Sequence, residues 1–391
     1  MSLEELRELE ARYAMPTYGR APVEFVRGEG ARLWDAEGGE YLDFFAGLSV
    51  HNAGHCHPAI TAAIREQAGR LVGTSNLYYN EPALRLAERL SEGTLGGRVF
   101  LANSGTEANE AAIKAVRRRA HGRGISEPEI VTLDGAFHGR SLAPLAATPK
   151  LAREDLFGPL PGGFRAVPRD DPEALRAAVG PATAAVMVEP IQGEAGVFPI
   201  ADEVLAAARE ACDEVGAALV FDEVQTGMGR TGSLWAFQRG PVRPDVLTAA
   251  KALGGGLPAG ACVIAPELGD GLGRGEHGST FGGSPLVCAA ALAALDVLDD
   301  AELLRRSREL GGRLMAGLEE LDAVVEVRGR GLMVGATLAA GVDAQGVAAR
   351  ALSAGLVVNV PGPGMLRLLP PLVIEGPDVD RALQTLAAAL P

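Results

Sequence analysis

The sequence between about residue 98 and residue 264 alternates short apolar, β-branched runs with longer segments of helical periodicity. The predicted strands are Val99 to Ala102, Ile130 to Leu133, Ala184 to Val188, Ala218 to Phe221, Val246 to Thr248 and Ala261 to Ile264, and the predicted helices include Glu107 to Ala120 and Glu203 to Val215. Continuously apolar strands that alternate with helices predict a mostly parallel sheet covered by helices on both faces. Ligands of such sheets bind beyond the carboxyl ends of the strands, so the residues that follow each strand are the candidates for a site.

The segments on either side of this region have a different pattern. Strand-like pieces occur in the first 50 residues, and a helix followed by short strands comes after Asp299. With 391 residues, 47% of them hydrophobic, the chain is long enough for more than one lobe and for a large core. We therefore expect an α/β fold with a large domain at residues 51–299 and a smaller α+β domain built from both chain ends, residues 1–50 and 300–391.

Charge excludes several kinds of partner. The chain carries 36 Lys and Arg residues against 50 Asp and Glu residues, a net charge of −14. Its surface would therefore repel the phosphates of nucleic acids and of anionic membranes. The first residues are acidic where a signal peptide needs basic ones, and the longest apolar run, Pro285 to Leu295, is too short to span a bilayer. We expect a cytoplasmic protein that binds neither nucleic acid nor membrane.

The cysteines give no sign of a metal site. Cys56, Cys212, Cys262 and Cys288 lie far apart and form no C-x-x-C pair, which favours reduced thiols in a core over disulfides or zinc ligands. His55-Cys56-His57 has residue types that bind metals, but the sequence has no matching second half. We expect no bound metal.

Lysine usage singles out one residue. Of the 36 basic residues, 33 are arginine and only three, Lys114, Lys150 and Lys251, are lysine. In a chain that uses arginine where only positive charge is wanted, a retained lysine points to chemistry that arginine cannot perform, such as losing a proton and forming an imine. Lys114 and Lys150 lie in a helical segment and a polar loop, where a solvated lysine is ordinary. Lys251 ends the apolar run Val246 to Ala250, so it is a Schiff-base candidate, although a lone lysine at a strand end more often only reaches solvent.

Two other strand ends carry groups that fit the same chemistry. Asp222 follows the run Ala218 to Phe221 and could either cap a helix or hold a proton on a pyridine nitrogen. After Ala102, Ser104 and Glu107 have capping-box spacing, and the free amides of a helix start suit a phosphate dianion. Most capping boxes bind nothing, but a phosphate cup, an acidic strand end and an imine lysine in this order are the combination that pyridoxal phosphate requires.

Two rival interpretations are weaker. The segment Gly329-Arg330-Gly331-Leu332-Met333-Val334-Gly335 imitates a dinucleotide fingerprint, which would suggest a nicotinamide-binding, NAD(P)-dependent dehydrogenase. A true fingerprint opens a helix, whereas Leu332 to Leu338 has the pattern of a strand. A non-catalytic protein that keeps the fold is disfavoured because each cofactor position holds a competent residue.

The sequence resembles the class III, fold type I aminotransferases nearly from end to end. The segments that carry the resemblance are Tyr41 to Phe44, Gly54-His55-Cys56-His57-Pro58, Ser75 to Tyr79, Asn103 to Glu110, Phe137-His138-Gly139-Arg140, Glu189 to Glu194, Asp222 to Gly232, Pro244 to Gly256, His277 to Pro285 and Arg367 to Leu372. The resemblance implies transamination with pyridoxal 5'-phosphate, a seven-stranded sheet in the large domain, and an obligate homodimer with shared active sites.

The same resemblance implies a role for each site residue. Lys251 and Asp222 are the implied catalytic residues, as the Schiff-base lysine and the partner of the pyridine nitrogen. The other implied cofactor-binding residues are Ser104, Gly105 and Thr106 around the phosphate, Phe137 and Val224 on the ring faces, His138, Gln225 at the ring hydroxyl, and Thr280 from the neighbouring subunit. The implied substrate-binding residues are Arg140, Arg367, Glu194, Ser279 and Leu48, with Glu194 pairing with Arg367 and releasing it when glutamate arrives.

The amino donor is less constrained than the cofactor. The resemblance is greatest to the acetylornithine branch, which implies transfer of the terminal amino group of an N-acylated diamino acid to 2-oxoglutarate in arginine biosynthesis. Leu48 stands where ornithine-specific relatives place a tyrosine and leaves apolar room for an acyl group, unless it is simply a core leucine. Ser284 replaces the usual Asn of the family, and Thr106 stands where acetylornithine members often have Ala. Ornithine, 4-aminobutyrate, a carrier-bound lysine precursor and the glutamate-1-semialdehyde aminomutase reaction therefore stay open as alternatives.

Overall fold

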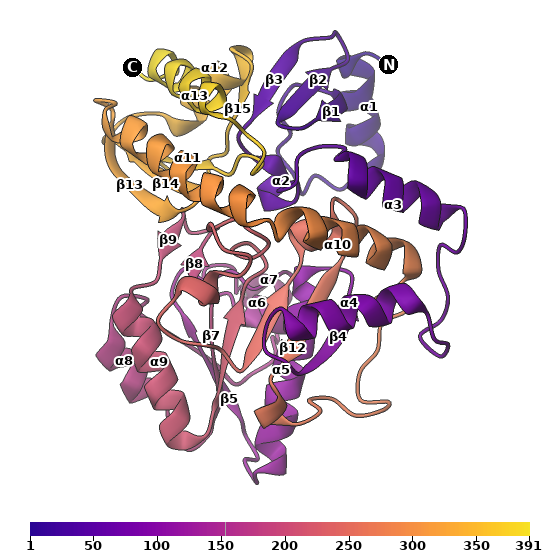
Figure 1. The fold of residues 1–391 in the computed structure, drawn as a ribbon. Coiled ribbons are helices and arrows are strands. Elements are labelled where there is room, and N and C mark those ends of the chain that lie inside the picture. Colours follow the sequence, from indigo (N-terminus) through magenta and orange to yellow (C-terminus); the bar gives the residue numbers. More distant parts are fainter. Residues whose placement is uncertain (153) are drawn as a thin grey trace.

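The computed structural model of the chain describes residues 1–152 and 154–391 and is built around a seven-stranded sheet (Figure 1). The strand order is β4-β12-β11-β10-β7-β5-β6, with β4 at Arg98–Ala102, β5 at Glu129–Leu133, β6 at Phe164–Val167, β7 at Thr183–Val188, β10 at Ala218–Asp222, β11 at Val246–Ala249 and β12 at Gly260–Ile264. Strand β12 is antiparallel to β4 and β11, and the pairs from β11 to β6 are parallel. The predicted mostly parallel sheet is confirmed.

The six predicted strands are all present, and their ends differ from the prediction by one residue at most. Every residue of β7, β10, β11 and β12 is buried, which explains why these strands are apolar except at Thr183, Asp222 and Thr248. The sequence pattern does not predict β6. This strand lies at the edge of the sheet and exposes Arg165 and Ala166, so it lacks a continuous apolar run.

Helices cover both faces of the sheet, as the pattern predicts. Helix α5, Gly105–Gly122, packs on the face that carries Val220 of β10. Helices α8, Pro172–Ala178, and α9, Asp202–Val215, pack on the opposite face, where Phe221 points. Successive residues of β10 therefore contact different helices, because strand side chains alternate between faces. Two short helices, α6 at Leu142–Ala146 and α7 at Glu154–Phe157, follow β5 in the chain.

A second part of the fold combines the two ends of the chain. One sheet joins β1 at Phe25–Glu29, β2 at Arg32–Asp35 and β3 at Glu40–Asp43 with β15 at Leu356–Val357, and another joins β13 at Val324–Arg330, β14 at Met333–Leu338 and β16 at Met365–Leu368. Strand β15 pairs in parallel with β3, so the smaller α+β part is built from both chain ends. The glycine-rich segment at 329–335 forms the β13–β14 hairpin, and no helix begins there, which removes the basis for a dinucleotide site.

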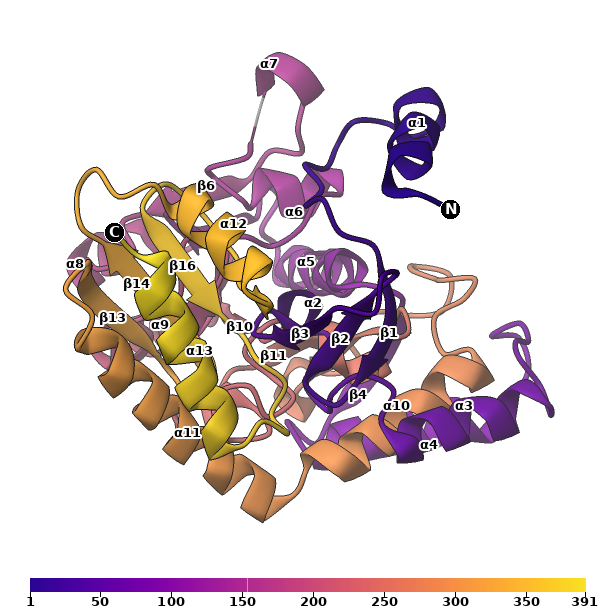
Figure 2. The same ribbon diagram turned by 90° about the horizontal axis from the view of Figure 1, so that it is seen from above.

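The remaining helices surround these sheets (Figure 2). They are α1 at Leu3–Tyr13, α2 at Ala46–Ser49, α3 at Pro58–Ala68, α4 at Glu81–Glu92, α10 at Pro285–Leu298, α11 at Ala301–Glu319, α12 at Ala344–Ser353 and α13 at Gly376–Ala389. The strands β8, Ile191–Gln192, and β9, Phe198–Pro199, form a short pair, and 3-10 helices lie at Ala236–Arg239, Lys251–Gly254 and Pro266–Leu268. Helix α10 packs on α3 and α4, while α13 packs on α11 and α12. Helix α1 buries no residue and stands away from the sheets. Among the helices of the described residues, none is long and apolar enough to cross a membrane.

Candidate active site

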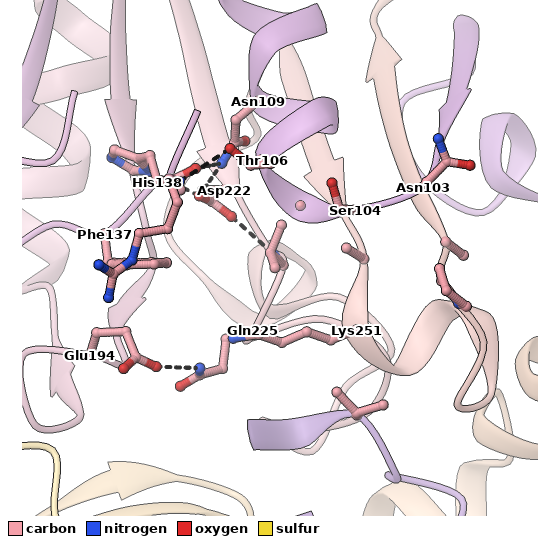
Figure 3. A pocket seen from close by; sticks show the side chains of 18 of the residues that line it. Asn103, Ser104, Thr106, Asn109, Phe137, His138, Glu194, Asp222, Gln225 and Lys251 are labelled. Carbon is pink, nitrogen blue, oxygen red and sulfur yellow. Dashed lines mark hydrogen bonds and ion pairs between the residues drawn. The ribbon is translucent and has the colours of Figure 1, made fainter. Parts of the chain in front are cut away.

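A pocket of about 450 Å³ lies at the carboxyl ends of the parallel strands (Figure 3). Its wall contains Ser104 after β4, Phe137 after β5, Glu189 after β7, Asp222 at the end of β10 and Lys251 after β11. These residues are far apart in the sequence, and the sheet brings them together because its parallel strands end at one edge. The predicted residues that line this pocket are Ser104, Gly105, Thr106, Phe137, His138, Arg140, Glu194, Asp222, Val224, Gln225 and Lys251.

Lys251 projects into the pocket beside Gln225 (Figure 3). Strand β11 ends at Ala249, and Lys251 begins a tight 3-10 turn with φ at 49°. This left-handed conformation costs a non-glycine residue about 1–2 kcal/mol, so the surrounding structure must hold it. Burial lowers the pKa of the Lys251 amine to about 8. A neutral amine is therefore accessible close to neutral pH, as a nucleophile requires.

Asp222 is held by three hydrogen-bond donors and is almost completely buried (Figure 3). Its Oδ1 accepts a bond from the backbone N–H of Val224 at 3.0 Å, and its Oδ2 accepts one from Asn109 Nδ2 at 2.7 Å. His138 Nδ1 lies 2.8 Å from the same Oδ2. Burial acts to lower the pKa of His138, but the bond and the charge of Asp222 outweigh it and raise this pKa. Three hydrogen bonds thus satisfy this carboxylate in a place that water does not reach.

Asn109 is a site residue that the sequence reasoning missed. It lies on α5, where its Oδ1 accepts a hydrogen bond from Thr248 Oγ1 at 2.7 Å and its Nδ2 also donates to the backbone oxygen of His138 at 2.7 Å. It thus joins the support of Asp222 to β11. One feature of the sequence could have indicated it. Asn109 is a polar residue among the small apolar residues of α5, of which Ala108 and Ala112 are buried, and a buried polar side chain needs a hydrogen-bond partner.

The start of α5 presents free backbone amides to the pocket. Ser104 Oγ accepts a bond from Glu107 N at 3.3 Å, but the Glu107 carboxylate binds Asn103 N at 2.7 Å, so the predicted reciprocal capping box is only half formed. Among the described residues, none accepts a hydrogen bond from the backbone N–H of Gly105 or of Thr106. A Cβ atom on Gly105 would lie 2.8 Å from Val224 Cγ1, so only glycine lets the two residues approach. This arrangement can bind an anion such as a phosphate.

The Thr106 hydroxyl organises the neighbouring loop. Its Oγ1 accepts hydrogen bonds from Ser141 N at 3.1 Å and Arg140 N at 3.3 Å, and it lies 2.8 Å from Ser141 Oγ. An alanine here could form none of these contacts. Thr106 therefore connects the start of α5 to the loop that carries Arg140.

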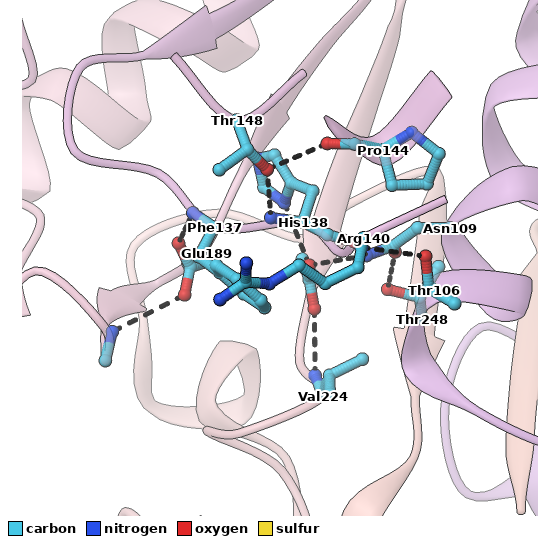
Figure 4. Close-up of polar contacts among 12 residues, drawn as sticks. Thr106, Asn109, Phe137, His138, Arg140, Pro144, Thr148, Glu189, Val224 and Thr248 are labelled. Carbon is cyan, nitrogen blue, oxygen red and sulfur yellow. Dashed lines mark hydrogen bonds and ion pairs between the residues drawn. The ribbon is translucent and has the colours of Figure 1, made fainter. Parts of the chain in front are cut away.

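Glu189 is a second residue that the sequence reasoning did not place. Its carboxylate accepts hydrogen bonds from Phe137 N at 2.8 Å and Gly193 N at 3.4 Å, so it ties the loop of Phe137 to the loop of Glu194 (Figure 4). Burial raises the pKa of Glu189 to about 7. Its only signal was its position in the Glu189 to Glu194 segment of the family resemblance.

Arg367 lies behind Glu194 and is fully buried. Its Nη1 lies 2.7 Å from Glu194 Oε1, and its Nη2 donates to Asn359 Oδ1 at 2.8 Å. Gln225 Nε2 donates to the same Glu194 oxygen at 3.3 Å. Burial acts to raise the pKa of Glu194, but the pairing with Arg367 outweighs it and lowers this pKa. In this arrangement the guanidinium of Arg367 is covered by a charged carboxylate.

Besides Arg367, which lies behind Glu194, three predicted site residues lie outside this pocket. Leu48 is partly exposed with φ at 66°, and Val50, two residues further on, lines the pocket in its place. Ser279 and Thr280 line a separate surface hollow of about 1000 Å³, where Ser279 Oγ accepts a hydrogen bond from Asn103 Nδ2 at 3.0 Å. The roles of these residues therefore stay predictions for this chain.

The histidine and cysteine residues form no metal centre in the part of the chain that the structure describes. His55 Nε2 lies 2.7 Å from Asp43 Oδ2, so this ring has a protein partner. All four cysteines are free thiols, in line with the expectation, but Cys56 is exposed and only the other three are buried in the core.

The sequence matches the family described as class-III aminotransferases over residues 13–390. The chain belongs to this family.

Its relatives include acetylornithine aminotransferases. The enzyme of that name from Methanocaldococcus jannaschii is 44% identical over 99% of this chain and 98% of its own length, and the one from Xylella fastidiosa is 47% identical over 97% and 95%. The crystal structure of the ornithine aminotransferase from Toxoplasma gondii is 34% identical, has a TM-score of 0.95 and covers 100% of this chain and 95% of its own. The fold and the class of enzyme predicted from the sequence are thereby confirmed.

Proposed function

We propose that this class III aminotransferase uses pyridoxal 5'-phosphate to move the terminal amino group of N-acetylornithine to 2-oxoglutarate, which yields the semialdehyde and glutamate. The observation that carries the proposal is the meeting of Lys251, Asp222 and the free amides of α5 in one pocket. Acetylornithine as donor is supported by the two relatives of that name, which match nearly the whole chain.

The residues of the pocket fit pyridoxal phosphate. The hydroxyl and amide groups of Ser104, Gly105 and Thr106 would hold the phosphate, and Asp222 would hold the protonated pyridine nitrogen. Phe137 and Val224 would cover the two ring faces, while His138 supports Asp222 and Gln225 would reach the ring hydroxyl. When bound, the cofactor supplies a carbonyl that takes up the amino group and a ring that accepts electrons.

The chain's own groups move protons and hold charge. The Lys251 amine, with its pKa lowered to about 8, can take a proton from the substrate carbon that bears the amino group and deliver it to the other reacting carbon. Three donors hold the Asp222 carboxylate in place, where it would pair with the protonated nitrogen of the cofactor ring. Phe137 and Val224 keep water away from these groups.

Substrate recognition would depend on two arginines. A guanidinium binds a carboxylate through two parallel hydrogen bonds, and both Arg140 and Arg367 lie at this pocket or directly behind it. Glutamate has two carboxylates, whereas N-acetylornithine presents a terminal amine at the reacting end. Glu194 would therefore cover Arg367 in the first half-reaction and release it in the second. Leu48 and Ser279 are proposed to complete the substrate site, with Leu48 beside the acyl group.

The donor is tested with a panel of amines at saturating 2-oxoglutarate. N-acetylornithine should have a higher kcat/KM than ornithine or 4-aminobutyrate. If either of these exceeds it by more than about tenfold, about 1.4 kcal/mol, the acetylornithine assignment is wrong and the aminotransferase assignment stands. Ornithine is the main alternative donor, because the structure of the ornithine aminotransferase from Toxoplasma gondii matches this fold with a TM-score of 0.95.

The cofactor is tested by reduction. Borohydride should join pyridoxal phosphate permanently to Lys251, and the Lys251→Arg variant should take up no label. Label on Lys114 or Lys150 would refute the role of Lys251.

We also propose a cytoplasmic homodimer in which Thr280 reaches the partner's cofactor. The hollow that contains Thr280 is bordered by large exposed apolar side chains: Leu77 is 88% exposed and Phe281 is 71% exposed. Monomeric proteins seldom expose such a patch. Sedimentation of the purified protein tests the dimer, and limited proteolysis tests the proposed domain limits near residues 50 and 299.

A further inference from the structure

The loop that carries Glu194 joins the two short strands β8 and β9. Glu194 Oε1 lies 2.7 Å from Arg367 Nη1, and the function proposed above requires this contact to break and to form again in every catalytic cycle. The balance between a covered and an uncovered Arg367 therefore depends on how firmly the protein holds this loop. Strand β9 lies beside β13 of the smaller part of the fold, so the loop is within reach of that strand (Figure 1).

Arg328, on β13, contacts the backbone on one side of this ion pair and a side chain next to the other. Its Nη2 donates a hydrogen bond to the backbone oxygen of Gly196 at 2.8 Å, two residues after Glu194. The same nitrogen lies 3.5 Å from the sulfur of Met365 on β16, two residues before Arg367. One guanidinium thus connects the loop of Glu194 to the strand of Arg367.

The Arg328 guanidinium is itself held in one orientation. Its Nη1 donates to Thr337 Oγ1 at 2.6 Å and lies 3.0 Å from the Glu326 carboxylate. Its Cζ lies 3.9 Å from the ring centre of Phe198, the first residue of β9. Because a guanidinium is planar, it can stack on a ring and donate from two nitrogens at the same time. A lysine ammonium could not make all of these contacts.

A cation in this place costs free energy. The Arg328 side chain is buried, and none of the described residues forms a hydrogen bond with its Nε. A second cation, Arg169, also lies 3.9 Å from the ring centre of Phe198. Burial lowers the pKa of Arg328, and the charge of Arg169 acts in the same direction against that of Glu326. An apolar side chain would fill this space without these costs, so the hydrogen bonds are what Arg328 adds.

The end of the loop is anchored, whereas Glu194 keeps some freedom. Val197 is fully buried and packs in one cluster with Ile191 of β8 and Met333 of β14. The Glu194 side chain is about one-third exposed. Loss of the Arg328 bond should therefore shift the position of Glu194 without unfolding the loop.

We propose that Arg328 is a positioning residue that holds the Glu194 loop in the arrangement that covers Arg367, and that it thereby sets how readily the enzyme exchanges a donor with a terminal amine for glutamate. The inference rests on the proposed function, in which Glu194 covers Arg367 in one half-reaction and releases it in the other. Without the bond from Arg328, the covered arrangement is less favoured and a second carboxylate reaches Arg367 more readily.

Binding of glutarate measures this balance without any reaction. Glutarate is glutamate without its amino group, so its second carboxylate needs an uncovered Arg367. In the holoenzyme, Arg328→Met should tighten the calorimetric Kd of glutarate about threefold and raise kcat/KM for glutamate relative to N-acetylornithine by a similar factor. Arg328→Lys keeps the charge but lacks the planar fork, so it should resemble Arg328→Met and not the parent.

A double variant separates positioning from a merely structural role. If Arg328 acts through Glu194, adding Arg328→Met to Glu194→Ala should change neither the Kd of glutarate nor the ratio of kcat/KM values by more than about 1.5-fold. A general loss of structure would persist in the absence of Glu194. The control is Arg330→Gln on the same strand, which removes an ion pair of 3.3 Å with Asp202 of α9 and should leave both values unchanged.

Three results would overturn the role of Arg328: an unchanged Kd and ratio in Arg328→Met, an equal shift with and without Glu194, or parent-like values in Arg328→Lys. If Arg328→Met does not fold, Arg328→Lys decides by the same criteria. A parent enzyme that does not turn over N-acetylornithine refutes the proposed donor instead. The Kd of glutarate still tests Arg328 in that case, so the two failures are distinguishable.

Discussion

Replacement of Asp222 by asparagine tests the electrostatic design of the site. The change keeps the shape of the side chain and exchanges one oxygen for an NH₂ group. In the structure, Oδ2 receives Asn109 Nδ2 at 2.7 Å and faces His138 Nδ1 at 2.8 Å, while Oδ1 receives Val224 N at 3.0 Å. Whichever way the amide turns, its NH₂ group faces at least one donor in a buried place.

The cost follows from these contacts. Each buried donor that loses its acceptor costs about 1–3 kcal/mol. The favoured orientation of the amide leaves one donor, Val224 N, without its acceptor, so we expect Asp222→Asn to lower the free energy of unfolding by about 1–3 kcal/mol. His138 loses the partner that raises its pKa most, so burial is opposed only by the charge of Glu189 and the pKa of His138 should fall. Without a carboxylate to hold the proton on the cofactor nitrogen, kcat should fall by orders of magnitude.

The neighbouring carboxylate provides a matched control. Glu223 is equally buried, and burial raises its pKa to about 7, but it accepts bonds from Ala236 N at 2.6 Å and Phe237 N at 2.9 Å and does not line the pocket. Glu223→Gln should therefore lose comparable stability in thermal unfolding and keep its turnover per bound cofactor. If Asp222→Asn retains kcat within about threefold of the parent, about 0.7 kcal/mol, the electron-sink role of Asp222 is wrong.

Two further outcomes are expected. Glu194→Ala should uncover Arg367 and raise kcat/KM for glutamate relative to N-acetylornithine by roughly three- to tenfold. The effect is limited because the Glu194 side chain is about one-third exposed, so solvent partly screens its charge. An unchanged ratio of the two kcat/KM values would show that no such switch operates. Cofactor-free protein should take up pyridoxal phosphate at Lys251 faster as the pH rises, and this rate should level off above about pH 8. The reason is that burial lowers the pKa of the Lys251 amine and that the neutral amine is the nucleophile. A rate that still increases up to the ordinary lysine pKa near 10.5 would contradict this prediction.

The parts of the fold that could be read from the sequence are those that depend on local periodicity. Strands β7 and β10 contain the unbroken apolar runs Ala184 to Val188 and Ala218 to Phe221 because both of their faces are covered, and this pattern is visible without knowledge of the partners. The edge strand β6 was not predicted, because half of its residues are exposed and it therefore lacks a continuous apolar run. Leu48 shows how far the sequence could predict the site residues. Its position relative to a family motif suggested that it lines the pocket, but Val50 lines the pocket instead.

The sequence by itself determined the parallel sheet, the strand ends at which Asp222 and Lys251 stand, and the chemistry of a lysine in a chain that otherwise uses arginine. Only the tertiary structure decided which side chains hydrogen-bond to the residues of the site. Asn109 lies 113 residues from Asp222, and Arg367 lies 173 residues from Glu194, yet each pair is in hydrogen-bond contact. A hydrogen bond depends on a few tenths of an ångström between elements packed from distant parts of the chain, whereas strand patterning depends on neighbours two residues apart.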